Sequence, residues 1–132
     1  MERTDKKVSY EPVSQRDRSG RPYTPETAAA ELDAALSILR GRWKPLILFH
    51  LFDGGCMRLS DLERAIPAAS QKMLIQHLRQ LEVAGVVRRV VYPEVPPRVE
   101  YSLTGSGQAL CPILDGLLVW AAGCRPAATE TG

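Results

Sequence analysis

The spacing of apolar residues predicts a series of helices from Pro25 onward. Thr24 is the predicted N-cap of the first helix, because Pro25 suits a first helical turn. A second helix begins near Trp43 and stops at the glycine-containing turn 53–55. This second helix is apolar on nearly every side, so we expect it to be central and buried.

Two further helices follow, separated by a tight turn. Ser60 and Glu63 have the spacing of a capping box and predict a short third helix, which Pro67 ends. The next helix begins at the N-cap Ser70 and stops at Gly85. A helix, a short turn and a second helix in this order predict a helix-turn-helix.

After the fourth helix the apolar period changes from 3.6 to 2, which predicts strands. The segments VVRRVVY and VEYSL predict two antiparallel strands, joined by a loop that holds three prolines. A last apolar helix follows its predicted N-cap, Thr104. We therefore expect a mainly α fold with a small β-ribbon (α+β), a winged helix-turn-helix with extra N- and C-terminal helices.

Both ends of the chain differ from this periodic middle. Residues 1–23 are polar and show no apolar face, so they predict a flexible arm, followed by one domain at 24–123 and a flexible tail at 124–132. The arm carries three arginines close together, which leaves open a contact with DNA phosphates beside a solubilising role. These arginines are Arg16, Arg18 and Arg21.

Composition and charge exclude some functions. The net charge of +2 means that any nucleic-acid surface must be local. Three cysteines without CxxC spacing and only two histidines predict that there is no metal site. The sequence also lacks the pairing of a nucleophile with a base that would indicate an enzyme. The N-terminus lacks a signal-peptide core and the apolar runs are shorter than a membrane span. We therefore expect a cytoplasmic protein that has no cofactor and no membrane contact.

One face of the predicted helix at 70–84 carries basic and amide side chains and no acid before Glu82. These side chains fall within about 100° of arc, opposite a leucine stripe. Lys and Arg bind phosphate or guanine, and Gln pairs with adenine, so the face suits the major groove, although a solvated surface is the alternative. The candidate DNA contacts on this helix are Ser70, Gln71, Lys72, Ile75, Gln76 and Arg79.

Arginines flank the proline-rich tip of the predicted wing at 92–98. The prolines stiffen the loop, so Arg98 would reach the minor groove or the DNA backbone at little entropic cost. Side chains alternate along a strand, so Arg88 and Arg89 point to opposite faces and only one of them can face DNA. We take Arg88 as the candidate phosphate contact.

The motifs GRWKPLILFHLFDGG, SQKML and YPEVPPRVEYSLT together resemble the HxlR-type winged-helix transcriptional regulators of bacteria, over roughly residues 30–122. The resemblance implies a homodimer that binds a palindromic operator in double-stranded DNA, and we expect a repressor. It also implies that the first and last helices form the dimer interface. The candidate interface residues are Leu32, Leu36, Leu110, Ile113, Leu114, Leu117 and Trp120.

Two features depart from this family. Members that sense oxidants carry a cysteine thirteen residues before the tryptophan, where this chain has Ala30, so that thiol switch is absent. The segment TGSGQAL holds glycines where the family has an acid and a leucine, so we expect the last helix to begin loosely. The three cysteines predict unreactive thiols. A protein-interaction module and a regulator gated by an unidentified small-molecule effector remain the alternatives.

Overall fold

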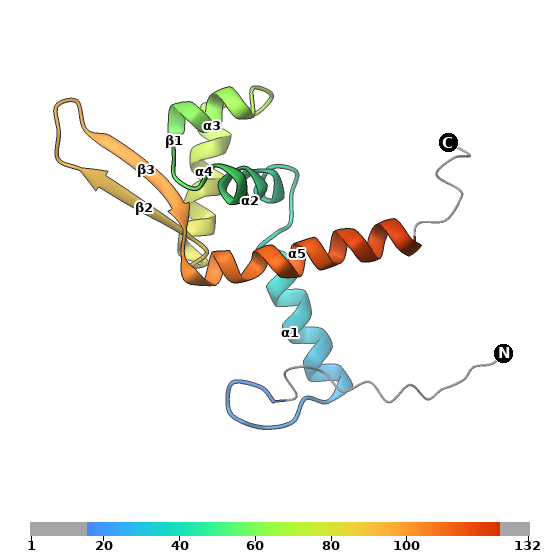
Figure 1. Cartoon of the computed structure of the whole chain (residues 1–132). Coiled ribbons are helices and arrows are strands. Elements are labelled where there is room, and N and C mark those ends of the chain that lie inside the picture. Colours follow the sequence, from blue (N-terminus) through green and yellow to red (C-terminus); the bar gives the residue numbers. More distant parts are fainter. Residues whose placement is uncertain (1–15, 125–132) are drawn as a thin grey trace. The chain divides into compact units, whose positions relative to one another are not determined.

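The computed structural model describes residues 16–124 (Figure 1). The first fifteen residues of the predicted arm, and the predicted tail after Cys124, lie outside the described residues. The chain divides into two compact units, one ending at Ser37 and the other beginning at Ile38.

The first unit contains helix α1, Pro25–Ser37, which begins where the sequence predicts. The Thr24 hydroxyl accepts a hydrogen bond from the Thr27 N–H at 3.1 Å, and the Thr27 hydroxyl accepts one from the Thr24 N–H at 2.8 Å. These bonds satisfy backbone donors that a helix N-terminus leaves unpaired. No residue of α1 is buried, so its apolar side chains remain exposed within one chain.

The described part of the predicted arm forms a closed turn. The Asp17 carboxylate accepts hydrogen bonds from the Ser19 hydroxyl at 2.6 Å and from the Ser19 and Arg21 N–H groups at 2.9 Å each. The bond from the Ser19 hydroxyl is the main cause that lowers the pKa of Asp17 below its ordinary value. This segment is therefore locally folded, although it has no apolar face.

The second unit is a winged helix-turn-helix with one added strand. Helices α3 and α4 form the helix-turn-helix, and the β2–β3 ribbon extends from the helices as the wing (Figure 1). The antiparallel sheet has the strand order β1-β3-β2. The elements are α2 (Trp43–Gly54), β1 (Met57–Arg58), α3 (Leu59–Ala65), α4 (Gln71–Val83), β2 (Val87–Tyr92), β3 (Arg98–Leu103) and α5 (Gly105–Cys124).

The core of this unit lies where α2, α3 and α4 meet the face of the sheet that carries Val87 and Tyr101. We call this the inner face. Its fully buried side chains include Ile47, Leu48, Leu51, Leu62, Leu74, Leu78, Leu81 and Val87. The prediction that α2 is buried on all sides is wrong for a single chain, because Leu46 and Phe49 are more than a third exposed. The exposed side of α2 therefore remains available to a further surface.

Two local predictions near β1 need correction. Helix α3 begins at Leu59, and the Arg58 N–H donates to the Asp61 carboxylate at 2.9 Å. The predicted cap at Ser60 is thus wrong, because the capping carboxylate belongs to Asp61 rather than to Glu63. The sequence also did not predict β1, which has only two residues and pairs Met57 with Tyr101.

Helix α5 begins in close contact with the chain just before the wing. The Thr104 hydroxyl accepts a hydrogen bond from the Gly107 N–H at 3.0 Å and donates one to the Gly85 carbonyl at 2.6 Å. A Cβ on Gly107 would overlap the Val86 carbonyl oxygen. The expected loose start is therefore wrong, since Gly107 is buried and its lack of a side chain allows the close approach.

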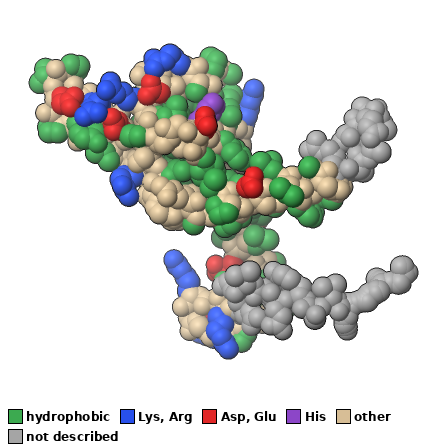
Figure 2. Space-filling model, in the orientation of Figure 1, with side chains coloured by type: hydrophobic (Ala, Val, Ile, Leu, Met, Phe, Trp, Pro, Cys, Tyr) green, Lys and Arg blue, Asp and Glu red, His purple; other side chains and the backbone are tan. Residues whose placement is uncertain are grey.

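Helix α5 is also apolar over most of its surface. Apolar side chains gather along it (Figure 2), and Leu114 and Gly107 are its only buried residues in the described chain. With 20 residues and a mean hydropathy of 1.3, it is the one described helix that could cross a membrane by length and composition. The sequence prediction concerned uninterrupted apolar runs, and these remain short because Gly, Gln and Asp interrupt them within α5.

We expect Gly107→Ala to destabilise the protein by about 1–3 kcal/mol, because the added methyl group forces α5 away from Val86. Gly116→Ala is the matched control in the same helix, since a Cβ there meets no atom within 4 Å. It should increase stability by about 0.5–1 kcal/mol. Urea denaturation at one fixed protein concentration measures both, and equal effects would contradict the close-packing explanation.

Candidate nucleic-acid interface

Helix α4 presents two chemically different sides. The Ser70 hydroxyl caps it by accepting a hydrogen bond from the Met73 N–H at 3.1 Å. Leu74, Leu78 and Leu81 are fully buried against the core. The residues of the predicted DNA face lie on the other side, where all are exposed except the half-buried Ile75. The exposed members are Ser70, Gln71, Lys72, Gln76 and Arg79.

A hollow of about 380 Å³ separates α4 from the inner face of the ribbon. From α4 it is lined by Ile75, Arg79 and Glu82, and from β2 by Arg89. Two guanidinium groups from different elements therefore line one concave surface. We call it the inner hollow. Glu82 also lines it, although the sequence suggested that this carboxylate lies beyond the basic face.

The register of the ribbon separates its two neighbouring arginines. Arg89 pairs with Tyr101, and Arg88 pairs with Ser102. Cross-strand partners share a face of the sheet, so Arg88 projects from the face opposite Arg89. It lines a different hollow, which does not contain any residue of α4. The geometry therefore places Arg89, and not the predicted Arg88, beside the basic face of α4.

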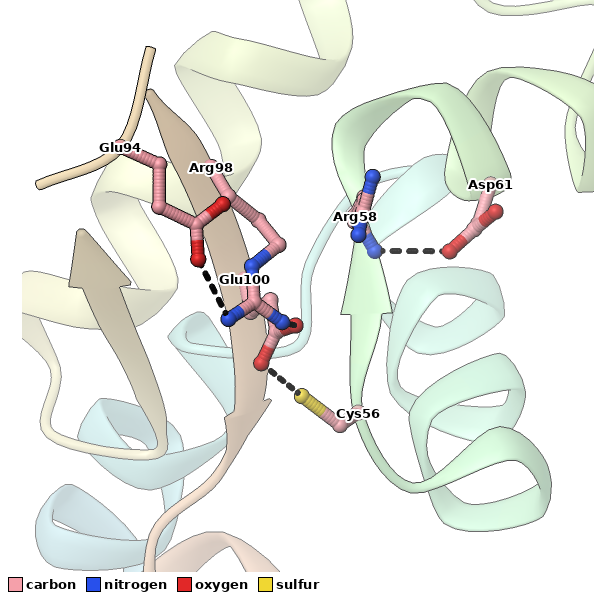
Figure 3. A network of polar contacts seen from close by, with 6 residues as sticks. All are labelled: Cys56, Arg58, Asp61, Glu94, Arg98 and Glu100. Atoms are coloured by element: carbon pink, nitrogen blue, oxygen red, sulfur yellow. Dashed lines mark hydrogen bonds and ion pairs between the residues drawn. The ribbon is translucent and has the colours of Figure 1, made fainter. Parts of the chain in front are cut away.

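Arg98 is bound within the wing itself. Its guanidinium pairs with Glu100 at 2.7 Å and with Glu94 at 3.0 Å, and lies 4.0 Å from the centre of the Tyr92 ring. Figure 3 shows the two carboxylates on either side of the Arg98 head group. These contacts fix the base of the proline-rich tip and compensate the charge of Arg98. A DNA contact by Arg98 remains a prediction.

The Glu100 carboxylate also connects the Arg98 cluster to Cys56. The Cys56 thiol donates a hydrogen bond to Glu100 at 3.0 Å (Figure 3). This bond is the main cause that raises the pKa of Cys56 above its ordinary value, and it lowers the pKa of Glu100. The thiol form of Cys56 is thus stabilised. Sequence patterns could not reveal the pair, because its members lie 44 residues apart.

A family model described as HxlR-like helix-turn-helix matches residues 38–128. The chain belongs to this family. It is 44% identical to an uncharacterised HTH-type transcriptional regulator of Methanothermobacter thermautotrophicus. The alignment extends over 102 residues and covers 77% of each chain. The HxlR-like match spans the second unit described above and includes α4, the wing and α5.

Solved structures of similar proteins have the same fold. The HTH-type transcriptional regulator YtcD, from Bacillus subtilis, is 48% identical and superposes with a TM-score of 0.65 over 70% of this chain and 93% of that one. The redox regulator HypR in its reduced form is 37% identical, with a TM-score of 0.68 over 76% and 98% of the two chains. This HxlR-type protein is therefore a DNA-binding transcriptional regulator with a winged helix-turn-helix, and not an enzyme.

We expect Glu100→Gln to make Cys56 react with iodoacetamide at lower pH, because removing the carboxylate lowers the pKa of the thiol. The pH profile of alkylation should be measured by mass spectrometry in a Cys111→Ser, Cys124→Ser background. Glu94→Gln is the control, since Glu94 contacts Arg98 and makes no hydrogen bond to Cys56. An unchanged profile in Glu100→Gln would contradict the proposed stabilisation of the thiol.

Proposed function

We propose that this regulator binds a palindromic operator as a cytoplasmic homodimer and represses transcription from it. One observation carries the proposal. Arg79 on the exposed side of α4 and Arg89 on the wing both line the inner hollow. Three leucines anchor the other side of α4 in the core. A rigidly anchored helix with exposed basic and amide groups is what recognition of the major groove requires.

The residues of α4 divide by their chemistry. Lys72 and Arg79 are proposed to contact phosphate or guanine, and Gln76 to pair with adenine. Ile75, which is half-buried, is suited to a thymine methyl group. The N-terminal turn of α4, at Ser70 and Gln71, directs free backbone N–H groups outward and suits a phosphate.

The wing contact is proposed for Arg89. Its side chain lines the inner hollow with Arg79, whereas Arg88 lies on the opposite face of the same strand. Arg98 is proposed to act mainly by holding the tip of the wing, since two carboxylates already compensate its charge. In this arrangement the wing and α4 approach the DNA backbone from two sides.

Exposed apolar side chains on α5 and α1 support the proposed dimer. Ile113, Leu117 and Trp120 follow one another at helical spacing on α5 and are 57%, 47% and 66% exposed. On α1, Leu32 and Leu36 are 59% and 42% exposed. Exposed apolar side chains in such a run are typical of an interface.

Two of the predicted interface residues are less available to a partner. Leu114 is only 8% exposed within one chain, and Leu110 packs against the protomer core. The proposed interface therefore centres on the five exposed residues. In a dimer of this kind the two α4 helices lie about 34–36 Å apart, one turn of DNA, which accounts for a two-fold operator.

We expect Arg89→Ala to weaken binding to the upstream DNA of the regulated gene and to lower the salt slope by about 1, because one phosphate contact is lost. Arg88→Ala is the matched control and should leave both quantities unchanged. Fluorescence anisotropy at several salt concentrations measures them, with a scrambled duplex for comparison. Equal affinity of the native protein for both duplexes would contradict sequence-specific binding.

We expect Leu117→Asp to convert the dimer to monomer, since an unpaired carboxylate buried in an interface costs about 3–5 kcal/mol. Val119→Asp introduces the same charge on the side of α5 that carries Asp115 and should leave the dimer intact. Both positions are exposed in one chain, so neither change disturbs the protomer core. Sedimentation velocity distinguishes the states, and a dimeric Leu117→Asp variant would refute this interface.

A further inference from the structure

A second hollow of about 530 Å³ lies on the face of the ribbon opposite the inner hollow. We call it the outer hollow. It is built from four elements of the second unit: the end of α2, the strands β2 and β3, and the first turns of α5. The residues that give it its chemistry are Leu51, Phe52, Arg88, Ser102, Gln108 and Cys111.

The outer hollow is lined by both apolar and polar side chains. Phe52 is half-buried and supplies the apolar surface from α2, because Leu51 is almost completely buried. Arg88 and Ser102 are directly paired across β2 and β3 and project from the same face. Gln108 adds an amide from α5. The volume of the outer hollow lies within the range of about 300–1,000 Å³ that is typical of small-molecule sites.

Among residues 16–124, Arg88 is the one charged side chain that lines the outer hollow. No Asp or Glu of residues 16–124 lines it. Over the same residues, the Arg88 side chain makes no ion pair or hydrogen bond, in contrast to Arg98 with its two carboxylates. A guanidinium binds a carboxylate with two parallel hydrogen bonds, and the exposed Arg88 side chain is accessible to such a ligand.

We propose that the outer hollow binds a small organic monocarboxylate with an aromatic or aliphatic body. The carboxylate pairs with Arg88 and accepts a hydrogen bond from the Ser102 hydroxyl. The apolar body packs against Phe52, and the Gln108 amide closes the site from α5. This assignment gives Arg88 a ligand-binding role on the face where the wing does not meet α4.

The position of this site couples it to the DNA contacts. Arg88 precedes Arg89 on β2, so a ligand that ties Arg88 to α2 and α5 also fixes the ribbon that carries Arg89. The separation of Arg89 from Arg79 decides whether both reach the DNA backbone together. The bound carboxylate therefore changes operator affinity, and this regulatory part of the inference rests on the proposed function, whereas carboxylate binding does not.

The binding test is an NMR titration of the full-length protein without DNA. Benzoate, phenylacetate and hexanoate are the probes, benzamide is the uncharged control, and each is raised to about 20 mM, above the millimolar Kd expected for such small ligands. At least one carboxylate should shift the amide signals of Arg88, Ser102 and Gln108 saturably. Benzamide should bind about tenfold more weakly or not at all, which corresponds to the loss of about 1.4 kcal/mol.

Matched variants locate the site. Arg88→Gln should weaken carboxylate binding about tenfold or more, and Arg89→Gln should leave it unchanged, because the two side chains lie on opposite faces. Ser102→Ala should weaken it less than Arg88→Gln. The inference is overturned if no carboxylate produces saturable shifts in these residues, or if Arg88→Gln binds as the native protein does.

The regulatory test adds the bound carboxylate to the operator complex. Its DNA affinity should change in the native protein and in Ser102→Ala at a higher ligand concentration, but not in Arg88→Gln. Carboxylate binding without any change in DNA affinity would refute the regulatory part alone. A protein that binds carboxylate but has no sequence-selective DNA affinity would refute the proposed function and leave the ligand site supported.

Discussion

The burial of Leu74, Leu78 and Leu81 on one side of α4 is the constraint on which the rest of the second unit depends. These side chains pack in the same cluster as Ile47 and Leu51 of α2, so the rotation of α4 about its axis is fixed. A helix whose leucines are fully buried cannot turn without opening cavities, each of which costs about 2–5 kcal/mol for a leucine-sized loss. The exposed side of α4 is therefore held in one direction, which sets the direction of every DNA contact proposed for α4.

The alternation of side chains along β2 gives the wing two separate chemical surfaces. Arg89 lines the inner hollow with α4, while Arg88 lines the outer hollow with α2 and α5. Adjacent residues of identical chemistry are thereby assigned to different surroundings. The carboxylates of Glu94 and Glu100 hold Arg98 in place, so the wing has its own internal ion pairs and does not need DNA to keep its shape.

Local signals in the sequence were sufficient to predict most helix boundaries and the order of elements. Thr24 and Ser70 cap helices where expected, because their hydroxyls act on residues only three positions away. The features that escaped prediction depend on distant partners. Strand β1 exists only through its pairing with β3, the Cys56 hydrogen bond spans 44 residues, and the choice between Arg88 and Arg89 requires the register. The close approach of Gly107 to Val86 also depends on a distant partner, whereas helix propensity predicts only that glycine weakens α5.

The Thr104 hydroxyl ties three parts of the chain together, since it bonds to Gly85 after α4 and to Gly107 in α5. The Gly107 backbone packs directly on Val86, so the joint between the last helix and the base of the wing is rigid. A shift of α5 is therefore expected to move the base of the wing with it. In an assembly built through α5, the tolerance for operators with altered half-site spacing would be set by this joint rather than by the residues that touch the bases.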